Sequence, residues 1–68
     1  MRPLTPKERE ILQLVARNYS NKEIAQASGA SEETVKWHLK NVFAKLGAGS
    51  RKHAVVRART LGVIGLSD

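Results

Sequence analysis

Two lysines one helical turn apart, Lys36 and Lys40, are the residues whose type and spacing suggest the most specific chemistry. A lysine ammonium can donate to the acceptors that guanine presents in the major groove of duplex DNA. Trp37 and Asn41 repeat the same four-residue spacing, and an indole there suits a thymine methyl group or the sugar–phosphate backbone. The pattern of these four residues predicts a surface that contacts the edges of DNA bases and so distinguishes one sequence from another. The alternative is an ordinary solvated helix face.

A second group of polar residues is typical of phosphate contact. Several of them lie where a helix is expected to begin, and helix N-termini present free amides and a positive dipole to an anion. The predicted phosphate contacts are Asn21, Lys22, Ser31, Thr34, His38, Arg51 and Lys52. Ser31 can combine phosphate contact with helix capping. Arg51 could instead pair within the folded domain, and His38 could be merely solvated.

Positive charge is concentrated in the second half of the chain. The formal net charge is +6, from twelve Lys and Arg against six Asp and Glu. Charges in residues 1–33 cancel, whereas residues 34–68 carry seven basic side chains and only Asp68 as an acid. Such asymmetry indicates a polyanionic partner, with nucleic acid the first candidate and an anionic membrane surface the second.

Composition argues against several classes of protein. Sixty-eight residues are enough for one small domain, predicted to span residues 1–68. Cysteine is absent, and His38 and His53 lack metal-ligand spacing, so we expect neither a metal site nor a cofactor. No residues pair a nucleophile with a base, so an enzyme is not expected. No apolar run approaches the roughly 20 residues of a membrane span, and we expect a soluble, cytoplasmic protein.

The elements that must position these residues are helices, and the expected class is all-α. Two capping boxes, Thr5 to Glu8 and Ser20 to Glu23, mark helix starts, and Gly29 and Gly47 mark helix ends. No alternating run of β-branched residues predicts a strand. The expected helices span about 6–17, 21–28, 32–46 and 51–61.

Helix 32–46 has one apolar stripe, which indicates the side that docks onto the rest of the domain. Its members are Val35, Leu39, Val42, Phe43 and Leu46. The candidate base-reading residues project from the opposite side. In helix 51–61 the expected inner face is Ala54, Ala58 and Leu61, whereas Val56 projects away from it. Val63 and Ile64 are expected to fold back onto the core.

The junction between helices 21–28 and 32–46 matches a helix-turn-helix. The turn Ser28-Gly29-Ala30-Ser31 is short and contains glycine, as this motif requires. The shorter helix would brace the longer one, which could then enter a major groove.

Several ordered segments of the chain resemble the LuxR-type (GerE-like) helix-turn-helix domain. They are Leu4-Thr5-Pro6-Lys7-Glu8-Arg9-Glu10, Ser20-Asn21-Lys22-Glu23-Ile24-Ala25, Thr34-Val35-Lys36-Trp37-His38-Leu39-Lys40-Asn41 and Lys45-Leu46-Gly47. Segment 37–41 most resembles the large ATP-binding regulators of that family. The family usually has larger apolar residues at Ser28 and Ala30, so we expect less apolar burial in this turn.

The resemblance implies the C-terminal DNA-binding domain of a bacterial transcription regulator, whose effector domain lies outside this chain. Helix 32–46 would read the major groove, and helix 51–61 would pair two domains on an inverted repeat, which makes Val56 a candidate dimer contact. RNA polymerase is a further candidate partner.

Two other functions remain open from the sequence. A protein-interaction module would bind an acidic partner, such as a polymerase subunit, without selecting DNA sites. A membrane-surface protein would use basic amphipathic helices. The apolar face of helix 32–46 argues against the membrane, because the core needs it.

Overall fold

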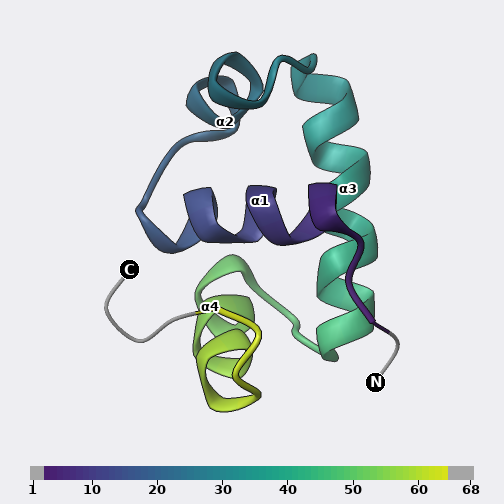
Figure 1. Ribbon diagram of the computed structural model, residues 1–68, viewed down its shortest axis with the longest axis vertical. Coiled ribbons are helices and arrows are strands. Elements are labelled where there is room, and N and C mark those ends of the chain that lie inside the picture. Colours follow the sequence, from purple (N-terminus) through teal and green to yellow (C-terminus); the bar gives the residue numbers. More distant parts are fainter. Residues whose placement is uncertain (1–2, 65–68) are drawn as a thin grey trace.

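The structure, a computed structural model, describes residues 3–64, and within that range every regular element is a helix (Figure 1). The helices are α1 (Pro6–Ala16), α2 (Asn21–Ser28), α3 (Glu32–Leu46) and α4 (Arg51–Thr60). The predicted all-α class with four helices is therefore confirmed. The first and last helices each end one residue earlier than predicted, which is within the usual fraying of helix ends.

Every helix begins at a hydroxyl residue that caps it. The side-chain oxygens of Thr5, Ser20, Ser31 and Ser50 each accept a hydrogen bond from the amide three residues further on. The two predicted capping boxes are complete. The Glu8 carboxylate accepts from the Thr5 amide at 2.9 Å, and the Glu23 carboxylate accepts from the Ser20 amide at 2.8 Å. Local sequence therefore fixes where each helix starts.

α3 is the element against which the other three helices pack. In Figure 1 it stands upright, with α1 crossing its middle, α2 near one end and α4 near the other. Two clusters of buried side chains result, and Phe43 and Val55 pack against both. One cluster joins α1, α3 and α4, and the other joins α1, α2 and α3. The long helix is thus docked along its length through its apolar stripe.

The prediction that Leu61 lies on the inner face of the last helix is wrong. Leu61 is 44% exposed, because α4 ends at Thr60 and the chain then turns through Gly62 with a φ of +72°. Ile64 instead reaches the core and is buried, as predicted, and Val63 is half-buried against it. Ile64, three residues further along the chain, therefore occupies the core in place of Leu61.

A buried ion pair fastens the start of α1 to the end of α3. Lys45 Nζ lies 2.6 Å from Glu8 Oε1 and also donates to the Pro3 carbonyl at 3.3 Å. Burial disfavours the ionised form of Glu8, which is 4% exposed, but hydrogen bonds from Lys45 and from the Thr5 amide outweigh it. The pKa of Glu8 is therefore lowered from its ordinary value of 4.5.

Glu8→Gln is expected to lower the free energy of unfolding by about 2 kcal/mol at pH 7, because it leaves the Lys45 ammonium without its carboxylate. A lowered pKa in the fold means that ionised Glu8 contributes stability above pH 4.5, and that this is lost as the pH falls through the lowered value. Urea denaturation of both proteins should therefore show a difference that shrinks as the pH is lowered below 4.5. Glu10→Gln, which changes an exposed carboxylate on the same helix, should alter stability by less than about 0.5 kcal/mol. An equal effect of the two substitutions would contradict a special role for the buried pair.

Candidate nucleic-acid interface

The turn between α2 and α3 is built from backbone geometry and hydrogen bonds. Gly29 has a φ of +72°, in the left-handed region that favours glycine, and the Ala30 amide donates to the Ala25 carbonyl at 3.0 Å. Ser28 Oγ donates to the Ile24 carbonyl at 2.7 Å, and Lys7 Nζ donates to the Ser28 carbonyl at 3.2 Å. The small residues at 28 and 30 are thus accompanied by bonds that tie the turn to α1 and α2.

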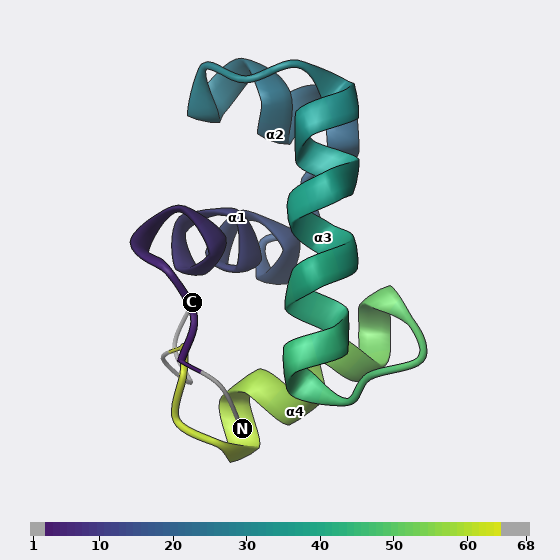
Figure 2. The ribbon, with the colours of Figure 1, turned by 90° about the vertical axis from the view of Figure 1, so that its right-hand side faces the viewer.

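The outer side of α3 is free of the other described helices, as Figure 2 shows from that side. The inner side carries Val35, Leu39 and Val42, which are all buried. Lys36, Trp37 and Lys40 are exposed, as the projection of the sequence predicts. Trp37 is 61% exposed, so the indole is not a core residue.

Asn41 and His38 lie at the margins of this surface. Both are half-buried, and the His38 ring meets the Trp37 ring edge-on at 5.0 Å with an interplanar angle of 66°. His38 Nδ1 is enclosed and has no hydrogen-bond partner among residues 3–64. Any contact from this imidazole to an external group would therefore use the other ring nitrogen.

The first turn of α3 presents two hydroxyl groups to solvent. Ser31 Oγ accepts from the Thr34 amide at 3.1 Å and donates to Thr34 Oγ1 at 3.0 Å. Both residues are exposed, and Lys22 and Lys52 are exposed in the first turns of α2 and α4. Capping by Ser31 leaves these side chains accessible to an anion.

Arg51 and Asn21 differ from the other predicted phosphate contacts, because they bind each other. Arg51 Nη1 donates to Asn21 Oδ1 at 2.9 Å, and Arg51 Nη2 donates to the Tyr19 carbonyl. Both residues are half-buried. The structure therefore shows the alternative pairing of Arg51 within the domain, a contact across 30 residues that no local motif signals.

Two further basic residues, which the sequence did not place at the interface, are also bonded within the domain. Lys45 is paired with Glu8, and Arg57 Nε donates to the Leu46 carbonyl at 2.7 Å. The exposed cations that remain on α3 and on the first turns of α2 and α4 are Lys22, Lys36, Lys40 and Lys52. The arrangement offers positive charge and hydrogen-bond donors to a polyanion.

Comparison with known proteins identifies the family of the chain. Residues 2–58 match the family described as bacterial regulatory proteins, luxR family. The chain belongs to this family. Its members are helix-turn-helix DNA-binding transcription regulators, so the predicted fold and class are confirmed.

Three relatives place this LuxR-family domain among regulators. The solved structure of the transcription factor GerE superposes with a TM-score of 0.86 at 42% identity and covers 96% of this chain and 98% of that one. The response regulator ChrA of a heme-sensing two-component system gives a TM-score of 0.90 at 38% identity, over 94% of this chain and 32% of ChrA. The response regulator VraR of Staphylococcus aureus is 49% identical over 55 residues, which are 81% of this chain and 26% of VraR.

The chain therefore spans about a quarter of the length of VraR. The resemblance of segment 37–41 to large ATP-binding regulators stays a prediction, because these relatives are a transcription factor and two response regulators. Within residues 3–64, no helix of the LuxR-family domain is long and apolar enough to cross a membrane, and no group of three potential ligands is placed to hold a metal ion.

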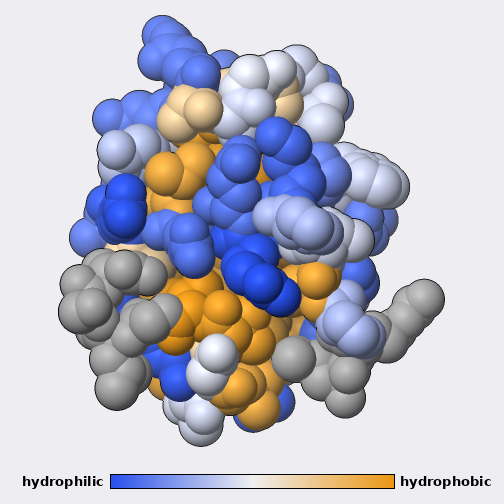
Figure 3. All heavy atoms as spheres, in the orientation of Figure 1, coloured by the Kyte–Doolittle hydropathy of each residue, from blue (hydrophilic) through white to orange (hydrophobic). Residues whose placement is uncertain are grey.

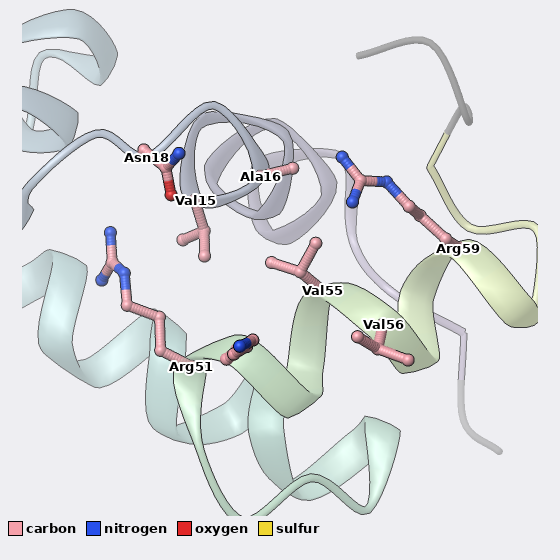
Figure 4. A pocket seen from close by; sticks show the side chains of 8 residues that line it. Val15, Ala16, Asn18, Arg51, Val55, Val56 and Arg59 are labelled. Carbon is pink, nitrogen blue, oxygen red and sulfur yellow. The ribbon is translucent and has the colours of Figure 1, made fainter.

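A shallow pocket of about 560 Å³ lies between the end of α1 and α4 of the LuxR-family domain. Figure 4 shows Arg51 and Arg59 at its two ends, with Val15 and Val55 between them. On the face seen in Figure 3, hydrophilic side chains cover α1 and hydrophobic atoms appear in the region of α4. Val56 lines the pocket and is 54% exposed, so the predicted dimer contact is accessible.

Proposed function

We propose that this LuxR-family domain binds specific sequences of double-stranded DNA in bacterial transcription regulation, with α3 in the major groove. The observation that carries the proposal is the exposure of Lys36, Trp37 and Lys40 on a helix whose opposite face is buried. A major groove about 12 Å wide admits one helix of about that diameter. α1, α2 and α4 pack against the inner side of α3 and hold it in place. Its outer side is left free to enter the groove.

The side chains divide into two roles. Lys36, Trp37, Lys40 and Asn41 contact base edges, because they lie along the outer side and margin of α3. The other group contacts phosphates at the rims of the groove: Lys22, Ser31, Thr34, His38 and Lys52. Arg51 and Asn21, which the sequence also predicted as phosphate contacts, are bound to each other within the domain. Exposure supports these roles best for Lys22, Ser31, Thr34 and Lys52. Phosphate contacts set the register of α3, and base contacts select the sequence.

The domain acts as a pair on an inverted repeat. A symmetric contact places the same patch of each copy against the other, and exposed Val56 on α4 is suited to this. The two half-sites would then lie about one helical turn of DNA apart. An effector domain outside this chain would control the pairing in a cytoplasmic regulator, and RNA polymerase is a further partner of the assembled complex.

Selection from randomised duplexes at a stated salt concentration tests this function. We expect enrichment of one sequence family with two inverted half-sites, because base contacts discriminate between sequences whereas phosphate contacts do not. A folded domain that enriches no sequence would contradict the proposal. Such a result would favour the protein-interaction alternative, in which the basic surface meets an acidic protein.

A further inference from the structure

We propose that Arg51 is a positioning residue, which holds the N-terminus of α2 at the DNA backbone and does not itself bind a phosphate. This inference rests on the proposed function. It differs from the direct phosphate contact expected from the sequence, because the guanidinium is already committed to two acceptors within the domain.

The two acceptors of Arg51 lie on either side of the cap of α2. One is the Tyr19 carbonyl and the other is Asn21 Oδ1, so the guanidinium binds the two residues that flank the cap Ser20. Ser20 in turn accepts from the Glu23 amide and starts the helix. A planar guanidinium offers two donors in a fixed fork, which fits a pair of neighbouring acceptors. Arg51 therefore fixes both the position and the direction of this helix start.

In the described part of the chain, no close backbone contact joins α4 to α2, whereas α2 packs against α1 and α3. Val55 of α4 packs against the apolar cluster that contains Ile24 of α2, but it makes no polar contact there. The hydrogen bonds from α4 to segment 19–28 that are found within residues 3–64 both come from Arg51. Figure 4 shows this side chain leaving the first turn of α4 and extending toward the end of α1, near Asn18. The Arg51 bridge thus sets the spacing between two helix starts on the proposed DNA-binding side.

The segment that Arg51 holds leads directly to an exposed cation. α1 ends at Ala16, and the chain continues without regular structure to Ser20, the cap of α2. Asn18, within this segment, has a φ of +65°. Lys22 follows in the first turn of α2 and is exposed. A small displacement of this helix start would move the Lys22 ammonium and the free amides of α2 away from a phosphate.

A charge-conserving substitution separates positioning from direct contact. Arg51→Lys keeps the positive charge, but one ammonium cannot reproduce the fork that reaches both acceptors. If Arg51 positions α2, then the variant loses the phosphate contact of Lys22 and its salt dependence weakens by about one released counterion. If Arg51 contacts phosphate directly, then the lysine retains most of the affinity and the salt dependence is unchanged.

The experiment is a double-mutant cycle on a selected duplex, with affinities measured across a range of salt. Lys22→Ala is expected to weaken binding about 3- to 10-fold in the wild-type background and less than about 2-fold in Arg51→Lys. Lys36→Ala is the matched control, because its contact belongs to α3, and it should cost the same in both backgrounds. Circular dichroism establishes that each variant is folded at the assay temperature.

Two results would overturn the proposal: wild-type affinity and salt dependence in Arg51→Lys, or additive effects of the Lys22 and Arg51 substitutions. If Arg51→Lys does not fold, then Asn21→Ala removes one acceptor of the bridge and takes its place in the same cycle with the same expectations. Different results would contradict the proposed function itself. These are a wild-type domain that selects no duplex, or a Lys36→Ala variant that binds the selected site with wild-type affinity.

Discussion

The double variant Lys36→Ala/Lys40→Ala is expected to bind a selected duplex at least about 30-fold more weakly than the wild type. Each lysine that contacts a base edge contributes about 1–3 kcal/mol, and the two lie one turn apart on the exposed side of α3. The loss should be much smaller on unrelated sequences, because the missing contacts are those that discriminate between bases. Fluorescence anisotropy of labelled duplexes at one fixed salt concentration measures both affinities.

A matched control removes the same charge from another surface. Arg9 lies in α1 and Arg17 directly follows it, and both are exposed. Figure 2 shows α1 beside α3 and not on its outer side. Arg9→Ala/Arg17→Ala should weaken binding less than about 5-fold, through the general loss of positive charge. Equal losses in the two double variants would show that net charge, and not the outer side of α3, determines binding.

Ile24→Ala is expected to remove about 2–5 kcal/mol from the free energy of unfolding. Ile24 is 0% exposed and is the main apolar anchor of α2. Its cluster contains Ile11, Val15, Ala25, Val35 and Leu39. A domain of 68 residues has a total stability of about 3–10 kcal/mol, so much of the population should be unfolded and DNA binding should fall with it. Urea denaturation followed by far-ultraviolet circular dichroism is the suitable measurement, because exposed Trp37 is a poor reporter of core packing.

Two substitutions calibrate that result. Ile24→Val removes one methylene and should cost about 0.5–1.5 kcal/mol. Val56→Ala changes an exposed side chain and should stay within about 0.5 kcal/mol. A denaturation midpoint of Ile24→Ala that equals that of Val56→Ala would contradict the assignment of Ile24 to the core.

Features governed by neighbouring residues could be predicted from the sequence. The capping residues Thr5 and Ser20 and the terminator Gly29 act within one helical turn, so their pattern gives the helix bounds to within one residue. The side of α3 that faces out follows from helical periodicity, because Val35 and Leu39 must be buried. This placed Lys36, Trp37 and Lys40 on the exposed side.

Features that depend on distant residues could not be predicted. Arg51 and Asn21 are 30 residues apart, and Glu8 and Lys45 are 37 apart, so no local pattern pairs them. The position of Leu61 also depends on tertiary structure. Gly62 turns the chain and brings Ile64 into the core, which leaves Leu61 outside. Spacing alone gave no means of choosing between these two apolar residues.

The central claim is that the outer side of α3 enters the major groove, and nuclear magnetic resonance of the ¹⁵N-labelled domain tests it most directly. The domain is titrated with a selected duplex, and the change in each amide resonance is followed. We expect the largest changes from Ser31 to Asn41 and at the first turn of α2, with small changes along α1. Large changes confined to α1 and the pocket beside α4, with the resonances of Lys36, Trp37 and Lys40 unmoved, would contradict the claim.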